Sequence, residues 1–309
     1  MEYVLETFNI SKRYKNQWAL KNVNMHIAKG DIYGFVGENG SGKTTIIRLI
    51  TGLISPTEGG FNLFGVPNTS SEITVARKKV GAIVETPSIY LNMSAKSNLE
   101  MQCGILGLKA GTEEKIKQVL ADVGLADQYD NKKRAGNYSL GMRQRLGLAM
   151  ALLGDPEFII LDEPMNGLDP AGIVEIRELI LKLNSERKIT FLISSHILTE
   201  LALVATRYGI ISKGQLVKEI GAEELKQECR PSLTVNTPDS ERLISLLSTY
   251  FAPEDLIPVA GGVKLIGNIR LNVLFKRLID ENIEITGVTS SGANIEEYYL
   301  SLIGGAHHA

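Results

Sequence analysis

Residues 37–45 read Gly37-Glu38-Asn39-Gly40-Ser41-Gly42-Lys43-Thr44-Thr45, and the rest of the chain is best interpreted outward from them. An apolar, partly β-branched run precedes them at 32–36, and an apolar pattern typical of a helix follows at 45–50. Strand, glycine loop and helix are the context that the pattern G-x-x-x-x-G-K-[ST] requires. Glycines allow a sharp turn beside a helix N-terminus, where backbone N–H groups attract anions. The stretch therefore predicts a phosphate-binding loop for a nucleotide.

We expect ATP and Mg²⁺ to be the ligands of this loop. Lys43 would reach the β- and γ-phosphates, and the Thr44 hydroxyl would take one coordination position of the metal. The glycines would bring backbone N–H groups close to the phosphate oxygens. The residues of the loop that we predict to bind the cofactor are Gly37, Asn39, Gly40, Ser41, Gly42, Lys43, Thr44 and Thr45.

The composition is that of a soluble globular protein. The chain has 309 residues, enough for one large domain or two smaller ones, and its net charge of −2 gives no sign of a nucleic-acid partner. Its two cysteines, at 103 and 229, are far apart, which favours a reducing compartment over a disulfide framework. The N-terminus does not resemble a signal peptide, and no run approaches the roughly 18 apolar residues of a membrane span. We therefore expect any membrane spans to come from another polypeptide.

Short apolar runs alternate with helical patterns over residues 1–221, which is typical of an α/β domain whose ligands bind where the strands end. A helical insertion interrupts this pattern at about 86–155, with one helix opening after Ser94 and another at Thr112. The strands that we expect lie at 2–10, 18–27, 32–36, 61–64, 80–84, 158–161 and 189–193, followed by a hairpin around 213–215.

Residues 222–309 form a second, small α+β unit in this interpretation. It carries no chemical motif, and we expect an accessory fold that serves packing, dimer contact or regulation. Its expected elements are a strand at 232–237, an amphipathic helix at 239–251, a hairpin turn at 259–264, a helix at 271–281, a strand at 283–288 and a last helix at 295–303.

Acidic side chains follow the buried run 158–161. Asp162 is expected to hold Mg²⁺, and Glu163 to face a water in line with the γ-phosphate. A strand end with solvated acids is the alternative. His196 ends a neighbouring strand, where it would either hydrogen-bond the γ-phosphate or the water, or be a satisfied core histidine.

The basic segment before the glycine loop supplies a candidate for adenine. Tyr14 would offer its ring for stacking, or it would be a half-buried packing residue instead. Trp18 is a weaker candidate for the same role.

Together these residues resemble the ATPase subunit of ABC transporters over about residues 1–220. The resemblance implies a P-loop fold of ABC type, in which a mixed sheet core carries an antiparallel β part and a helical subdomain. The matching segments are 37–45 with the Walker A motif, 158–163 with Walker B and its catalytic glutamate, 138–142 with the signature motif, 167–169 with the D-loop, His196 with the switch histidine and Tyr14 with the adenine-stacking aromatic.

The resemblance also implies a mechanism. Two ATPase subunits, here expected to be identical copies, pack head to tail, and Ser139 and Gly141 of one would bind the γ-phosphate held by the other. Asp169 would reach across this dimer. The helical subdomain would pass the motion to an integral membrane permease, so the protein is expected at the cytoplasmic face of the membrane.

The signature and position 85 depart from the usual family pattern. The signature, usually L-S-G-G-Q, has Leu140 and Met142 where glycine and glutamine are common. Glu85 replaces the glutamine that usually contacts Mg²⁺ and the attacking water, so we expect it to be a catalytic and metal-binding residue. A glutamate here, together with the ending 294–300, is similar to the subgroup that serves bacitracin-resistance and lantibiotic-immunity exporters.

The leading hypothesis is therefore an ATP-hydrolysing subunit that powers export by a separate permease, with a peptide antibiotic or a lipid-linked molecule as the transported molecule. A soluble ABC ATPase that acts on ribosomes or DNA is the alternative, although the chain has one P-loop and no sustained heptads. A regulatory nucleotide switch with little turnover is a third possibility.

Overall fold

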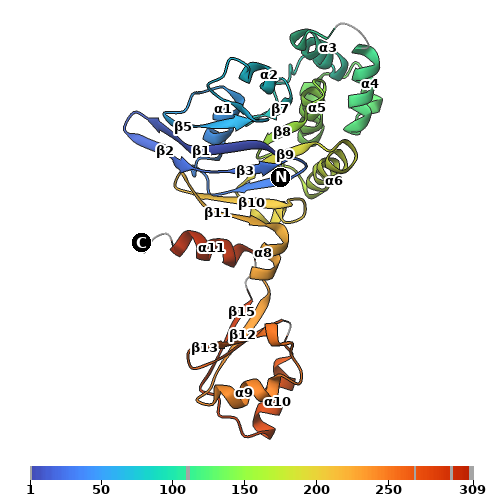
Figure 1. Cartoon of the computed structure of the whole chain (residues 1–309). Coiled ribbons are helices and arrows are strands. Elements are labelled where there is room, and N and C mark those ends of the chain that lie inside the picture. The colour runs from blue at the N-terminus through green and yellow to red at the C-terminus, as the bar shows by residue number, and fades with distance from the viewer. Residues whose placement is uncertain (1, 109–111, 268, 293–294, 306–309) are drawn as a thin grey trace. The chain divides into compact units, whose positions relative to one another are not determined.

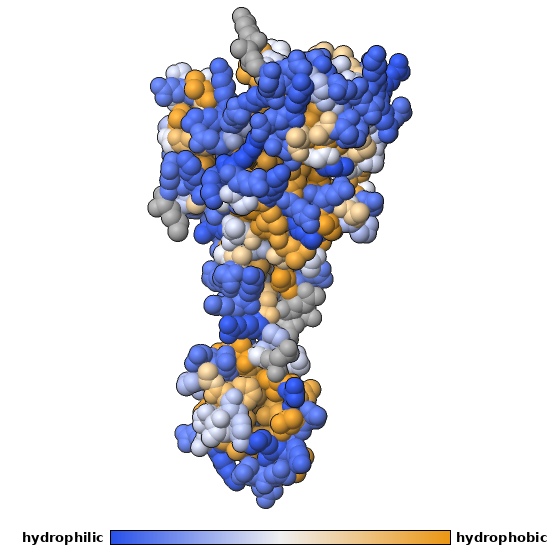
Figure 2. Space-filling view, turned by 90° about the vertical axis from the view of Figure 1, so that its right-hand side faces the viewer, coloured by the Kyte–Doolittle hydropathy of each residue, from blue (hydrophilic) through white to orange (hydrophobic). Residues whose placement is uncertain are grey.

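The computed structural model describes residues 2–108, 112–267, 269–292 and 295–305. The chain divides into two compact units, residues 1–222 and 223–309 (Figure 1). The boundary that we placed after residue 221 differs from this division by one residue. In the view of Figure 2, polar side chains cover most of the first unit, and apolar ones gather in patches between them.

A six-stranded sheet runs through the first unit in the order β11-β10-β4-β9-β8-β7. Its strands β4 (Ile32–Val36), β8 (Phe158–Asp162) and β9 (Thr190–Ser195) are buried along their whole length. Continuous burial of this kind suits parallel strands that are covered on both faces. The other strands are β7 (Val80–Ile83) and β11 (Gln215–Gly221) at the two edges, and β10 (Arg207–Ser212), which pairs antiparallel with β11 and parallel with β4.

A second sheet is antiparallel and comprises β1 (Tyr3–Tyr14), β2 (Gln17–Val23), β3 (His26–Ala28), β5 (Glu58–Leu63) and β6 (Val66–Pro67). The prediction of one strand at 18–27 is wrong, because β2 and β3 divide this segment. Strand β2 ends at Val23, one residue after Asn22, whose φ is +52°, and β3 begins at His26. The two strands pair with different halves of β1.

The main core lies between these two sheets and includes the helix that follows the glycine loop. Helix α1 (Lys43–Thr51) buries Ile46, Ile47, Leu49 and Ile50 in one cluster with residues from β1, β4, β5 and β8. The loop is therefore anchored at both ends, by a buried strand and a buried helix. The other helices of this part are α2 (Ile73–Arg77), α6 (Pro170–Arg187) and α7 (Leu198–Leu201).

The predicted helical insertion contains α3 (Ala95–Leu106), α4 (Thr112–Asp122), the short helices η1 (Ala126–Gln128) and η2 (Ala135–Asn137), and α5 (Leu140–Leu152). Ser94 caps α3 as predicted, since its side chain accepts a hydrogen bond from the Ser97 N–H. Helix α5 packs against β7, and α3 and α4 pack against α5. Within the described ranges, no helix combines the length and the apolar character needed to cross a membrane.

The second unit has its own sheet, β13 (Leu256–Val259), β14 (Gly262–Ile266), β12 (Pro231–Asn236) and β15 (Gly287–Gly292), in that spatial order. Helices α9 (Ser240–Leu247) and α10 (Leu271–Asp280) cover one face of it with leucine side chains. The remaining elements are α8 (Ala222–Glu228), η3 (Pro253–Asp255) and α11 (Ile295–Gly305).

The strand predicted at 283–288 is displaced. The Ile283 N–H bonds the Leu278 carbonyl at the end of α10, and its side chain joins the core, so pairing with β12 begins only at Gly287. The predicted fold class is confirmed: a mixed sheet with an antiparallel part and a helical part, followed by a small α+β unit.

Candidate functional site

The glycine loop connects β4 to α1, as predicted, and encloses a small cavity of about 200 Å³. Gly42 has a φ of +115°, and a Cβ there would lie 2.6 Å from Leu20 Cδ2, so this position requires glycine. Gly40 has a φ of +81° and faces open space. The residues that line the cavity are Ala19, Asn39, Gly40, Gly42, Lys43, Thr44, Thr45 and Glu163.

Lys43 brings a positive charge to the inside of this loop. Its side chain is buried, and its Nζ donates to the carbonyl oxygens of Gly37 at 2.6 Å and Glu38 at 3.2 Å. Nζ also lies 3.3 Å from Glu163 Oε1. A buried ammonium with several acceptors has a fixed position, and its charge favours an anion in the cavity.

Thr44 and Asp162 meet across the ends of α1 and β8. The Thr44 hydroxyl donates to Asp162 Oδ2 at 2.9 Å, and the Ser194 hydroxyl donates to Asp162 Oδ1 at 2.6 Å. Asp162 is only 2% exposed, so these two hydroxyls replace the water that the carboxylate loses on burial. The structure thus brings together Thr44 and Asp162, two of the three residues that we predicted to hold the metal.

Glu163 and His196 form the next layer of the site. His196 Nδ1 lies 2.7 Å from Glu163 Oε2, while the other oxygen of Glu163 faces Lys43. The backbone of Glu163 adopts a φ of +49°, and its N–H donates to Ser194 Oγ at 2.9 Å and to Ser194 O at 3.2 Å. Glu163 and His196, two of the three residues predicted to be catalytic, therefore lie together beside the glycine loop, and the Glu163 carboxylate is held from both sides.

Glu85 lies at the end of β7 and pairs with a cation instead. Its Oε1 accepts from Arg48 Nη2 of α1, and among the described contacts it meets neither Thr44 nor Asp162. The Glu85 backbone has a φ of +62°, a conformation that is uncommon outside glycine. Glu85 and Glu163 nevertheless line one cavity of about 390 Å³, together with Leu140 and Arg143 of α5.

Tyr14 is the last residue of β1, so the basic segment around it is part of a strand. The residue is 44% exposed, and the Lys12 ammonium lies 5.4 Å from the centroid of its ring. It pairs in register with Gln17 of β2, two residues before Ala19, which lines the cavity of the glycine loop. Trp18 is covered by the Arg13 guanidinium at 5.3 Å.

The signature and D-loop residues are apart from the glycine-loop cavity of this chain. Ser139 caps α5 by accepting from the Met142 N–H at 3.1 Å, and Gly141 lies in the first turn of that helix. Asp169 caps α6 by accepting from the Gly172 N–H at 2.9 Å. Ser41 Oγ is buried without a partner among the described residues.

Sequence reasoning missed two residues that touch the site. Ser194 contacts both Asp162 and Glu163, and Arg48 holds Glu85. Weak signals for both were present: Ser194 ends a buried strand next to Asp162, and Arg48 follows Thr44 by four residues on a helix.

Comparisons with known proteins agree with this geometry. Residues 20–166 match the family model described as "ABC transporter". The bacitracin transport ATP-binding protein BcrA of Bacillus licheniformis is 40% identical over 99% of both chains. The lantibiotic transport ATP-binding protein SrtF of Streptococcus pyogenes is 40% identical over 72% of this chain and 95% of its own.

Solved structures give the same result for the fold. The dimeric, post-hydrolysis ATP-binding cassette MJ0796, bound to ADP and Pi, superposes with a TM-score of 0.64 at 26% identity, covering 71% of this chain and 98% of its own. Neither these relatives nor this structure supports a ribosome- or DNA-acting protein. The chain belongs to the ABC transporter family, as an ATP-binding subunit that couples ATP hydrolysis to transport.

Proposed function

We propose that the glycine-loop site binds ATP together with Mg²⁺, and that its hydrolysis in a dimer drives a separate permease that exports a peptide antibiotic of the bacitracin type. One observation carries the catalytic part of this proposal. It is the continuous set of contacts from Thr44 through Asp162, Ser194 and Glu163 to His196.

The donor set beside Thr44 fits Mg²⁺. This cation prefers hard oxygen ligands and is commonly held by one or two carboxylates together with phosphates. The Thr44 hydroxyl and the Asp162 carboxylate are 2.9 Å apart and both lie at the glycine loop. Bound Mg²⁺ would neutralise charge on the phosphates, while Ser194 keeps the Asp162 carboxylate in place.

Glu163 is the residue that we assign to the attacking water. Its carboxylate is 21% exposed, so one oxygen can accept from a water while His196 Nδ1 holds the other. Lys43 would exchange its contact with Glu163 for the γ-phosphate when ATP enters. That exchange releases the Glu163 oxygen that faces Lys43 for the water.

A second copy of the chain would complete the phosphate site. Ser139 and Gly141 lie at the N-terminus of the 13-residue helix α5, where N–H groups favour an anion. They do not line the cavity of their own glycine loop, so the anion would belong to the partner subunit. The dimeric state of MJ0796 supports this arrangement.

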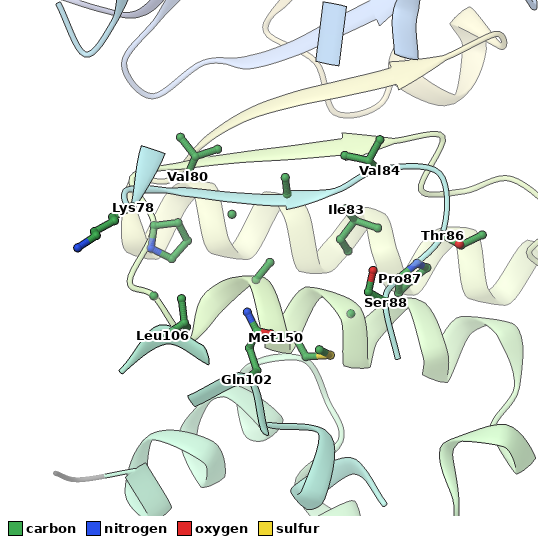
Figure 3. A pocket seen from close by; sticks show the side chains of 16 residues that line it. Lys78, Val80, Ile83, Val84, Thr86, Pro87, Ser88, Gln102, Leu106 and Met150 are labelled. Atoms are coloured by element: carbon green, nitrogen blue, oxygen red, sulfur yellow. The ribbon is translucent and has the colours of Figure 1, made fainter. Parts of the chain in front are cut away.

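The permease would bind beside the helical part. A groove of about 320 Å³ runs between β7, α3 and α5, and Figure 3 shows Val80 and Ile83 of β7 on one side of it and Gln102, Leu106 and Met150 on the other. Thr86, Pro87 and Ser88, which directly follow Glu85, close one end. Exposed apolar side chains lie on or near α3: Tyr90, Leu91, Met101, Ile105 and Leu106. Binding there would place the protein at the cytoplasmic face of the membrane.

The proposed substrate class rests on the relatives. BcrA proteins from Bacillus licheniformis and Enterococcus faecalis align over 99% of this chain, including the second unit, whereas SrtF aligns over 72%. A bacitracin-type peptide is therefore better supported than a lantibiotic.

The replacement Glu163→Gln tests the catalytic proposal. It keeps the shape of the side chain but removes the base, so steady-state ATPase activity should fall by at least about 100-fold while ATP binding persists. Glu178→Gln, on the exposed surface of α6, is the matched control and should leave turnover unchanged. Turnover within about twofold of the parent in Glu163→Gln would refute the assignment.

Two further experiments test the partners and the substrate. Purification of Glu163→Gln in detergent with ATP should recover a multi-span membrane protein in stoichiometric yield. Deletion of the gene should sensitise its host to bacitracin. Recovery of ribosomal or DNA-processing proteins in place of a membrane subunit would overturn the transporter assignment.

A further inference from the structure

A salt bridge joins α1 to the segment that follows β7. Arg48 Nη2 contacts Glu85 Oε1, and Arg48 follows Thr44 by four residues. Residues four apart lie on the same face of a helix, about 6 Å apart along its axis. Arg48 is therefore one helical turn from Thr44, whose hydroxyl bonds Asp162.

Negative charge accumulates where the phosphates of ATP would enter. Asp162, Glu163 and Glu85 are all acidic, and Glu85 shares a cavity with Glu163. Lys43 pairs with Glu163, and Arg48 pairs with Glu85. Without Arg48, the Glu85 carboxylate would add an unbalanced charge that repels ATP.

We propose that Arg48 is a positioning residue for ATP binding, which neutralises Glu85 and holds its carboxylate at the edge of the phosphate site. The need for such a cation follows from the acid at position 85, since a neutral glutamine there would have no charge to balance. The backbone of Glu85 has a φ of +62°. It is held by a tight turn, in which the Thr86 N–H donates to the Val84 carbonyl at 2.8 Å. Arg48 then fixes the side chain. This inference rests on the proposed ATP site.

The salt bridge is poorly placed to serve the stability of the fold. The side chains of Arg48 and Glu85 are 41% and 58% exposed, and exposed ion pairs of this kind contribute little to stability. Their removal should therefore leave the thermal unfolding midpoint of the nucleotide-free protein unchanged. The effect should appear in nucleotide affinity instead.

A double-mutant cycle separates these roles. Arg48→Gln, Glu85→Gln and the double variant are compared with the parent by equilibrium binding of a fluorescent ATP analogue with Mg²⁺, and by kcat and KM for ATP. Arg48→Gln should weaken binding and raise KM about fivefold in the parent, as removal of a partly exposed charge partner predicts. In the Glu85→Gln background, the same substitution should change affinity by less than about 1.5-fold, because no carboxylate remains to be balanced.

Two controls complete the experiment. Arg48→Lys keeps the charge and should restore most of the affinity, and Lys182→Gln, an exposed cation on α6, should change nothing. Equal losses of ATP affinity in both backgrounds, or no loss in either, would overturn the proposal. A lower unfolding midpoint for Arg48→Gln would also overturn it, because the residue would then stabilise the fold. Binding is measured without turnover. A site that does not bind ATP would show no binding in the parent protein, whereas an Arg48 that is not coupled to Glu85 would show equal losses in both backgrounds.

Discussion

The hydroxyl of Tyr33 should contribute more to stability than any ordinary surface polar group. Tyr33 lies in β4, directly before the glycine loop, and is fully buried. Its hydroxyl donates to Glu219 Oε1 at 2.7 Å, and His26 holds the same carboxylate through its N–H and through Nδ1, both at 2.9 Å. Hydrogen bonds to charged groups contribute about 1.5–3 kcal/mol, so Tyr33→Phe should lower the free energy of unfolding by about that amount.

Tyr208→Phe is the matched control in the neighbouring strand. Tyr208 is also buried, but its hydroxyl makes a long bond of 3.4 Å to the neutral carbonyl of Leu201, so we expect a loss of about 1 kcal/mol or less. The chain has one tryptophan, Trp18 of β2, and its fluorescence reports urea unfolding of the first unit. A Tyr33→Phe variant no less stable than Tyr208→Phe would refute the reasoning, because the charged acceptor is the difference between them.

Three other predictions use the same unfolding assay. Burial and the Glu219 charge raise the pKa of Tyr33 well above its usual value, and burial raises the pKa of Tyr208 to about 12. The folded state then holds these protons more tightly, so stability should be intact below about pH 10 and should fall as the pH rises towards these pKa values, less steeply in the double Phe variant. Gly37→Ala would place a Cβ 2.5 Å from the Ile211 carbonyl oxygen and should cost about 1–3 kcal/mol. Gly104→Ala faces open space in α3 and should stabilise the protein by about 0.5–1 kcal/mol.

The central part of the site could be predicted because it follows from local sequence. The glycine loop, the buried strand before it and the acids after 158–161 each need only their neighbours in sequence. Parallel strands then bring Lys43, Thr44, Asp162 and Glu163 together at one edge of the sheet, as strand register requires. The adenine, signature and D-loop assignments stay predictions, since they concern a ligand and a partner subunit.

What the sequence did not reveal depends on contacts between distant segments. Arg48 and Glu85 are 37 residues apart, and neither helix periodicity nor strand pattern indicates that they meet. The division of 18–27 into two strands accompanies the pairing of β2 and β3 with different halves of β1, which hydrophobic patterning does not encode. The displaced strand at 287–292 depends on where Ile283 enters the core of the second unit. Each error arose where tertiary packing overrode a local pattern.

Glu85 and Glu163 show that the identity of a residue alone does not determine where its side chain points. Glu85 and Glu163 each follow a strand of the parallel sheet and adopt positive φ values of 62° and 49°. For residues other than glycine this conformation costs about 1–2 kcal/mol, so other contacts must hold it. Ser194 supplies two acceptors to the Glu163 N–H, and the turn at Thr86 holds the Glu85 backbone, while Arg48 pairs only with the Glu85 side chain. The two carboxylates can therefore share one cavity because the backbone is strained at both strand ends, and residues outside the recognised motifs maintain that strain.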